Sequence, residues 1–228
     1  MEISIVDGRK EKEFRESTKV LVDVFRSTTT MPYILKGGCS KIIPTQSIKE
    51  ARSIKQDIPE SLLIGERYGI RIRGFDYNNS PYEVANVDFH GKTVIFTSTN
   101  GTKVLQRIKG KGDIFIASFV NAGATSVILK EQDRIDIVLS NRPDGPADED
   151  MFFGEYLREL LEGKTPDRVA YRKKIISSKG ARRLSIMGSK HDIEYTMNYD
   201  AVDFPIHFDG KYIVRYEQPA RVSGNFPA

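Results

Sequence analysis

Lys19-Val20-Leu21-Val22-Asp23-Val24-Phe25 is the stretch that sets the fold, because it reads as a buried β-strand with an acid near its end. Nearly continuous apolar runs are typical of strands covered by helices on both faces. Further runs lie at residues 41–44, 61–65, 92–97, 113–117 and 134–139. Helical patterns separate them, at 31–36, 47–56, from 80 onward, 101–108, 121–130 and 148–161. This alternation predicts an α/β fold with a mostly parallel sheet of about six strands and helices on both faces.

The chain beyond about residue 164 follows a different pattern. Helices are predicted at 167–177 and 189–199, and a hairpin at 206–214, where Asp209-Gly210 suits a type I′ turn. The length of 228 residues favours one large domain. We therefore expect a single α/β domain over residues 1–228, with a core over about 19–163 and a C-terminal helical and hairpin extension over about 164–228.

Composition limits the kinds of site that the chain can carry. The single cysteine, Cys39, excludes an intrachain disulfide and a cysteine-rich metal site, and we expect it to be a packing residue. The scattered His90, His191 and His207 do not suit a zinc site, so a bound metal is expected to have oxygen ligands, as Mg²⁺ or Mn²⁺ does.

Hydropathy and charge limit the partners. The apolar runs are too short to cross a membrane and the first residues lack a secretory signal, so we expect no membrane partner and a cytoplasmic location. The net charge of +4 fits either an anionic partner or a mixed solvated surface, since 31 acids stand among 35 bases. Nucleic-acid binding would rest on the basic pI alone. Because no Arg-rich tail or aromatic RNA-binding motif is present, we do not expect nucleic acid as a partner.

Polar side chains follow most of the predicted strands, at the edge where parallel sheets bind ligands. They lie at residues 26–30, 66–67, 97–101, 118–121, 141–144 and 148–150. Hydroxyls, amides and helix N-termini favour a bound phosphate, which Arg26 and Arg67 could hold through bidentate hydrogen bonds. Carboxylates at Asp23, Glu66 and Glu149-Asp150 offer oxygen ligands for Mg²⁺. Together these groups supply what phosphoryl transfer needs: charge neutralisation, positioning of the phosphate, and a group to orient or activate water.

Each of these groups also has a purely structural interpretation. The threonines at 28–30 could cap a helix, residues 97–101 could form a polar turn, and Glu149-Asp150 could balance a helix dipole. Asp23 could pair with Arg26, since a carboxylate in an apolar strand is costly unless it is paired or metal-bound. From the residues alone, both interpretations stay open.

Signatures of the common phosphatase classes are absent. Cys39 is followed six positions later by Thr45, where a Cys-x₅-Arg loop requires arginine. Asp23 is followed by Val24 and Phe25, where an Asp-x-Asp motif requires a second acid. No Gly-x₄-Gly-Lys-Ser/Thr nucleotide loop occurs.

Several segments, in order along the chain, nevertheless resemble the 2-phosphosulfolactate phosphatase family. Residues 22–30, Val-Asp-Val-Phe-Arg-Ser-Thr-Thr-Thr, resemble its Asp-x-x-Arg-Ala/Ser-Thr-Thr-Thr segment. Gly65-Glu66-Arg67 with residues 74–81, Gly-Phe-Asp-Tyr-Asn-Asn-Ser-Pro, is similar to its Gly-Glu-Arg and Gly-Phe-Asp-x-Gly/Asn-Asn-Ser-Pro loop. Residues 97–102 resemble its Thr-x-Thr-Asn-Gly-Thr turn, and residues 118–122 and 149–154 also fit.

The resemblance implies an α/β fold distinct from that of other phosphatases, and Mg²⁺-dependent hydrolysis of (R)-2-phospho-3-sulfolactate to 3-sulfolactate and phosphate, a step of coenzyme M biosynthesis. It also implies a homo-oligomer, for which we expect a homodimer. After the last core strand the family tends to have a small Cys-Ala-Gly-like turn, whereas this chain has Arg142 in that turn. A phosphatase for another small phosphorylated hydroxy acid, or a non-catalytic protein that binds anionic metabolites, are the alternatives.

The combined interpretation assigns a role to each candidate residue. We expect Asp23, Arg26, Glu66 and Glu149 to be catalytic, and the Mg²⁺ ligands to come from Asp23, Glu66, Glu149 and Asp150. Arg71 or Arg73 is expected to bind the sulfonate or carboxylate of the substrate. The expected substrate contacts are Thr28, Thr29, Thr30, Arg67, Asn78, Ser80, Thr97, Thr99, Asn100, Gly101, Ser118 and Asn121. Asp23→Asn or Arg26→Ala is expected to abolish phosphate release and leave the fold intact.

Overall fold

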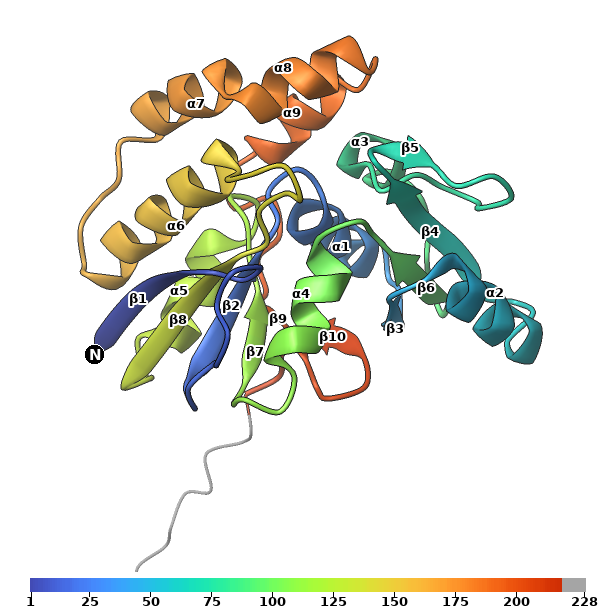
Figure 1. Cartoon of the computed structure of the whole chain (residues 1–228), viewed down its shortest axis with the longest axis horizontal. Coiled ribbons are helices and arrows are strands. Elements are labelled where there is room, and N and C mark those ends of the chain that lie inside the picture. The colour runs from blue at the N-terminus through green and yellow to red at the C-terminus, as the bar shows by residue number, and fades with distance from the viewer. Residues whose placement is uncertain (219–228) are drawn as a thin grey trace, which may run out of the picture.

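The computed structural model describes residues 1–218 of the chain (Figure 1). The first half contains β1 (Glu2–Asp7), β2 (Thr18–Val22), α1 (Ser27–Lys36), β3 (Lys41–Thr45), α2 (Ile48–Asp57), β4 (Leu62–Arg67), β5 (Ile70–Arg71), α3 (Pro81–Val84), β6 (Thr93–Thr97) and α4 (Gly101–Ile108). The second half contains β7 (Ile114–Ile116), α5 (Ala122–Leu129), β8 (Arg134–Leu139), α6 (Asp148–Leu161), α7 (Arg168–Ser177), α8 (Lys179–Ile186), α9 (His191–Thr196), β9 (Ile206–Phe208) and β10 (Ile213–Arg215).

One mixed sheet of ten strands runs through the described part of the chain, in the order β1-β8-β2-β7-β9-β10-β3-β6-β4-β5. Two parallel groups, β1-β8-β2-β7 and β3-β6-β4, are joined by the antiparallel pair β9–β10. The predicted α/β class with a mostly parallel sheet is therefore confirmed. The expected number of about six strands is too low, because β1 and β5 were not assigned and the predicted hairpin enters the sheet.

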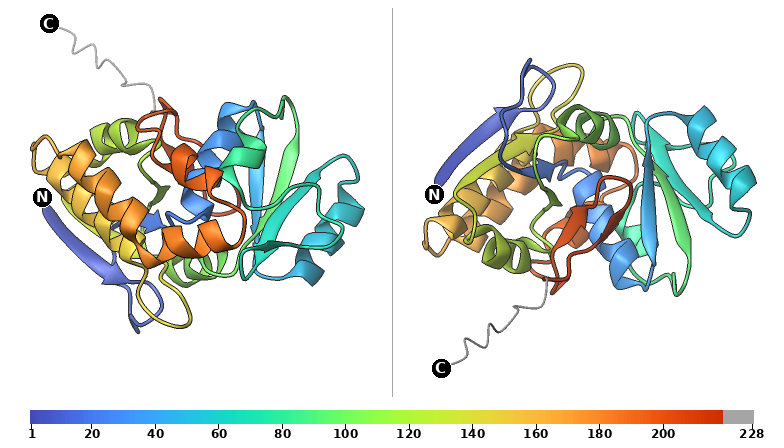
Figure 2. Two further views of the ribbon diagram at one scale, coloured as in Figure 1. Left: turned by 90° about the horizontal axis from the view of Figure 1, so that it is seen from above. Right: turned by 90° about the horizontal axis from the view of Figure 1, so that it is seen from below.

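Helices cover both faces because side chains alternate along each strand. On β2, Leu21 packs into one core with Leu105 of α4, while Val20 and Val22 pack into the other with Phe153 of α6. In the other half, α2 covers the face that carries Ile43 and Ile95, opposite α1 and α3. Figure 2 shows the same layering from above and below.

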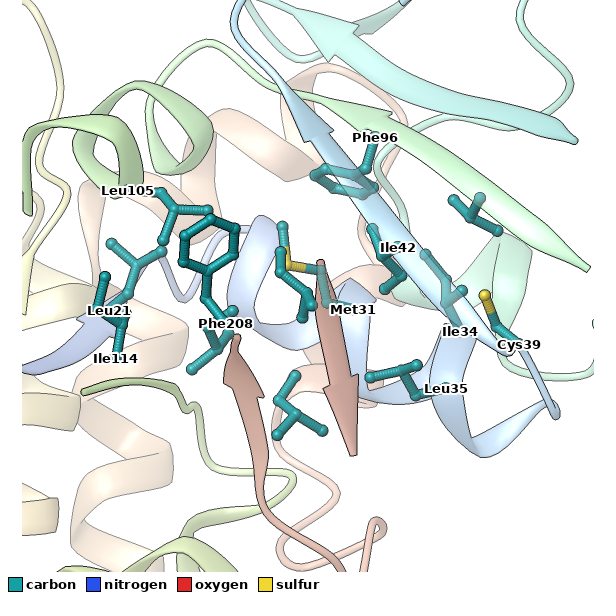
Figure 3. Packing of buried hydrophobic residues seen from close by; sticks show 14 of the residues in the cluster. Leu21, Met31, Ile34, Leu35, Cys39, Ile42, Phe96, Leu105, Ile114 and Phe208 are labelled. Atoms are coloured by element: carbon teal, nitrogen blue, oxygen red, sulfur yellow. The ribbon is translucent and has the colours of Figure 1, made fainter. Parts of the chain in front are cut away.

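The largest core lies around α1 (Figure 3). Met31, Ile34 and Leu35 of α1 pack with Ile42 of β3 and Phe208 of β9. Strands β9 and β10 pair with β7 and β3 and also contribute to this core, so the β9–β10 hairpin joins the two parallel groups. Cys39 lies in the same core, which confirms its packing role, and burial raises the pKa of its thiol to about 11.

The region predicted as a C-terminal extension also supplies α7, α8 and α9. These helices lie along the top in Figure 1 and in front of the sheet in the left view of Figure 2, so they cover one end of the strands. The helices predicted at 167–177 and 189–199 are present as α7 and α9, whereas α8 was not predicted. Residues 219–228 of the predicted extension lie outside the described residues. None of the helices within 1–218 has the length and apolar character needed to cross a membrane.

A buried charge network closes the opposite end of the strands. Lys19 is fully buried and its ammonium donates to the Ser17 hydroxyl at 2.6 Å and lies 3.6 Å from an Asp136 carboxylate oxygen. Asp136 also accepts from Arg15 at 2.7 Å and from the Ser17 hydroxyl at 2.7 Å. Burial would raise the pKa of Asp136, but the hydrogen bonds from Arg15 and Ser17 and the two cations outweigh it, so its pKa lies below the ordinary value of 3.8.

This network predicts a loss of stability in acid. A depressed carboxyl pKa stabilises the fold above the unfolded value of 3.8, and that contribution is lost as pH falls through the folded value. We expect the urea unfolding free energy to fall more steeply below about pH 4 in the wild type than in Asp136→Asn. Asp133→Asn, which changes an exposed acid just before β8, is the control and is expected to keep the wild-type slope. Equal slopes for wild type and Asp136→Asn would contradict a lowered pKa of the Asp136 carboxyl in the folded protein.

Candidate active site

A cavity of about 300 Å³ opens where the loops after β2, β4, β6 and β8 meet helix α8. The ends of these strands and the four loops contribute Asp23, Phe25, Arg26, Glu66, Tyr68, Gly69, Thr99, Asn100, Arg142, Pro143 and Asp144. Asn79 comes from the segment between β5 and α3, and the α8 segment contributes Gly180, Arg183, Leu184 and Met187. The predicted residues Asp23, Arg26, Glu66, Thr99 and Asn100 therefore share one cavity. They meet because parallel strands bring their carboxyl ends to one edge of the sheet.

Asp23 lines the cavity and lies directly after β2. Its Oδ2 accepts hydrogen bonds from the Ser27 hydroxyl at 2.7 Å and from the Gly101 backbone N–H, at the start of α4, at 2.9 Å. A side chain at position 101 would not fit, because its Cβ would lie 2.8 Å from the same oxygen. Burial raises the pKa of the Asp23 carboxyl, the nearby Glu66 carboxylate adds to this, and the hydrogen bonds from Ser27 and Gly101 oppose it.

Glu66, at the end of β4, connects two loops of the cavity. Its Oε1 accepts from the Thr99 backbone N–H at 2.5 Å, and its Oε2 accepts from the Gly69 N–H at 2.6 Å and from the Thr99 hydroxyl at 2.9 Å. These bonds fix the loops after β4 and β6 against each other. The result is a carboxylate that is 6% exposed and lines the cavity in a fixed orientation.

The acids at the start of α6 lie behind the cavity wall. Both oxygens of Asp150 accept backbone N–H groups, from Val24 at 2.8 Å and from Asn141 at 3.1 Å, so Asp150 joins the loops after β2 and β8. Glu149 pairs with the Arg142 guanidinium through Oε1, while its Oε2 is buried and has no partner within the described residues. Burial raises the pKa of both carboxyls, and the nearby Asp23 carboxylate adds to the shift.

The predicted metal ligands can be compared with the needs of Mg²⁺. In residues 1–218, no three His, Cys, Asp or Glu side chains are grouped so that they could hold a metal ion on their own. Mg²⁺, however, commonly binds through one or two carboxylates, with water and substrate phosphate as the other ligands. Asp23 and Glu66 fit that requirement, because both line the cavity and their charges repel each other, so a cation between them would relieve the repulsion.

Arg26 lies in the cavity wall, but its pairing differs from both sequence interpretations. Its guanidinium is buried and donates to Asp192 of α9 at 2.7 Å and to the Gly69 carbonyl at 2.7 Å. The alternative in which Arg26 pairs with Asp23 is therefore wrong. Arg67 points elsewhere, since it donates to the Glu66 and Gln46 carbonyls and to the Thr97 hydroxyl and does not line the cavity.

Most of the other predicted polar residues support the loops and do not line the cavity. Thr28 Oγ1 accepts the Asp23 N–H at 3.0 Å, and Thr29 and Thr30 donate to backbone carbonyls of the same loop at 2.9 and 3.0 Å. This group comprises Thr28, Thr29, Thr30, Asn78, Ser80, Thr97, Gly101, Ser118 and Asn121. Arg71 and Arg73, expected to bind a second anion, are exposed and also lie outside the cavity lining.

The sequence interpretation missed the contributions of α8 and α9. Gly180, Arg183 and Leu184 line the cavity from α8, and Asp192 of α9 holds Arg26. No motif pointed to them, because the segments that resemble the family end at residue 154. Only the run of basic residues around Arg182-Arg183 could have drawn attention to this segment.

Comparisons with known proteins all lead to one family. The sequence profile of a family described as 2-phosphosulpholactate phosphatase matches residues 3–209. A protein of Thermoplasma volcanium named probable 2-phosphosulfolactate phosphatase is 43% identical over 212 residues, covering 92% of this chain and 98% of the relative. Proteins with the same name from Thermoplasma acidophilum and Caldicellulosiruptor saccharolyticus are 41% and 33% identical, covering 92% and 85% of this chain and 94% and 90% of the relatives.

Proposed function

The chain belongs to the 2-phosphosulpholactate phosphatase family and is a phosphoric monoester hydrolase, and we propose that it hydrolyses 2-phospho-3-sulfolactate to 3-sulfolactate and phosphate with Mg²⁺. One observation carries the proposal most strongly. Asp23, Glu66 and Asn100 lie at or just beyond the carboxyl ends of three different strands, and all three line a single cavity together with three arginines. Charge neutralisation, positioning and activation of water can therefore take place in one enclosed volume.

Within this proposal, the chain's own residues hold the substrate and the attacking water. The Ser27 and Gly101 hydrogen bonds fix Asp23 so that its carboxylate faces the cavity. Asp23 orients a water molecule toward phosphorus and takes up its proton as the new P–O bond forms, while the bond to the hydroxy-acid oxygen breaks and that oxygen takes up a proton from the solvent. The Asn100 amide, at the start of α4, donates to a phosphoryl oxygen.

Asp23 and Glu66 are the residues that would hold Mg²⁺, because they are the predicted ligands that line the cavity. Bound there, Mg²⁺ would neutralise negative charge on the phosphoryl group. Asp150 does not line the cavity, and its two oxygens join the loops after β2 and β8 through backbone N–H groups, so in this proposal it supports the loops and does not bind the metal. A cytoplasmic location, a homodimer and a place in coenzyme M biosynthesis stay predictions from the family resemblance.

Phosphate release with a panel of esters tests the proposal. The metal-free protein is expected to release phosphate from 2-phospho-3-sulfolactate only after Mg²⁺ is added, and excess chelator is expected to stop the reaction. Phospholactate and 3-phosphoglycerate serve as the related phosphorylated hydroxy acids in the panel. Faster release from one of these would favour the alternative substrate class, and full activity in chelator would contradict the role of the metal.

A further inference from the structure

Helix α8 lies across the cavity with one face toward it. Gly180, Arg183, Leu184 and Met187 recur at the spacing that places side chains on one side of a helix, whereas Arg182 lies outside the cavity lining. The segment packs closely against its neighbours at two glycines. A Cβ at Gly180 would collide with the Glu149 carboxylate, and a Cβ at Gly69 would lie 2.5 Å from the Met187 methyl. The α8 segment therefore spans the cavity from α6 to the loop after β4.

The three arginines that line the cavity differ in how their charge is balanced. Arg26 is buried and paired with Asp192, and Arg142 is paired with Glu149. Arg183 is exposed, and in the described part of the chain its guanidinium has no hydrogen-bond or ion-pair partner. A free guanidinium presents a planar fork of donors that matches the oxygens of a carboxylate, phosphate or sulfonate. Arg183 is thus the cavity arginine that is available to a ligand.

The surroundings of Arg183 indicate which part of a ligand it would meet. Asp23 and Glu66 are 5% and 6% exposed, so the acidic end of the cavity is enclosed, whereas Arg183 stands on an exposed wall. Leu184 and Met187 lie on the same wall and provide apolar contacts. A ligand with its phosphoryl group at the acidic end would place a second anionic group, separated by a short carbon chain, beside Arg183.

We propose that Arg183 binds the sulfonate of the substrate and so sets the preference for sulfonated over non-sulfonated phosphate esters. The inference rests on the proposed function, because it takes the substrate to be a phosphate ester with a second strong anion. A sulfonate stays ionised at all physiological pH values, so a permanently charged guanidinium is a suitable partner. This role replaces the one expected for Arg71 or Arg73.

Arg183→Ala, Arg183→Lys and the matched control Arg182→Ala test the inference. For each purified protein, kcat/KM is measured for 2-phospho-3-sulfolactate and for 2-phospholactate, which has a methyl group in place of the sulfomethyl group. The ratio of the two values is expected to fall roughly 10–100-fold in Arg183→Ala, mainly through KM, because a charge-assisted pair is lost. Arg183→Lys should recover part of the ratio, and Arg182→Ala should keep the wild-type ratio.

The outcomes separate this inference from the proposed function. A wild-type ratio in Arg183→Ala, or equal losses on both substrates, would overturn the role of Arg183 and leave the proposed function standing. A wild type that does not hydrolyse 2-phospho-3-sulfolactate would overturn the proposed function, and the inference with it. Because Arg183 is exposed, the variants are expected to fold, and circular dichroism checks this.

Discussion

Replacing Asp23 by asparagine is expected to lower kcat for phosphate release about 10³-fold. Asparagine has nearly the same shape and can still accept the Gly101 N–H through its amide oxygen, so the loop after β2 should keep its structure. It cannot take up a proton from the attacking water and it is a weaker ligand for Mg²⁺. Steady-state phosphate release at saturating substrate and Mg²⁺ measures the effect.

A control separates this chemical effect from a general loss of structure. Asp57→Asn changes an exposed acid at the end of α2 and is expected to keep the wild-type rate. Thermal unfolding should give nearly the same midpoint for Asp23→Asn and the wild type. If purified Asp23→Asn kept a third or more of the wild-type kcat, Asp23 would have no part in activating water.

The second large effect is expected on stability, from the Arg26–Asp192 pair. Arg26 is 3% exposed and Asp192 is 1% exposed, and their charged groups are 2.7 Å apart. Asp192 also accepts from the Ser80 hydroxyl at 2.5 Å and from the Tyr82 N–H at 3.2 Å. Removing either partner leaves the other charge buried and unpaired, which costs about 3–5 kcal/mol. For a chain of this size that lowers the melting temperature by roughly 6–20 °C.

Thermal unfolding of Arg26→Ala, Asp192→Ala and the double variant measures this coupling. The double variant is expected to lose much less stability than the sum of the single variants, since no unpaired charge is left. Glu162→Ala breaks the exposed Glu162–Lys164 pair and is expected to leave the melting temperature unchanged. Additive losses would contradict the coupling. From the sequence alone, Arg26→Ala was expected to leave the fold intact. The buried pair predicts instead that this variant is less stable than the wild type.

The sequence alone was sufficient for the residues that follow parallel strands. Asp23, Glu66 and Asn100 each come just after a buried run, and the rule that carboxyl ends share one edge predicted that they would meet. Short-range patterns also identified the hairpin at 206–214, which forms the β9–β10 pair. The predicted type I′ turn is wrong, because Gly210 has a positive φ and Asp209 does not. In these cases local sequence and topology point to the same arrangement.

Features that depend on long-range packing could not be predicted in this way. Nothing in the hairpin sequence indicates that it inserts between β7 and β3, because that position depends on the shape of both halves of the sheet. Helix α8 carries Arg183 to the cavity through tertiary contacts, and Asp192 meets Arg26 from 166 residues away. The threonines at 28–30 were expected to contact the substrate, but their hydroxyls form hydrogen bonds with backbone groups of their own loop. Hydroxyl side chains often bond to nearby backbone in this way.

A crystal structure of the wild-type protein soaked with 3-sulfolactate, phosphate and Mg²⁺ tests the central claim most directly. We predict that phosphate binds beside Asp23, Glu66 and Asn100 and that the sulfonate contacts the Arg183 guanidinium. Products bound outside this cavity, for example beside Arg71 and Arg73 or in the groove between α1 and α9 near Tyr33, would contradict the account.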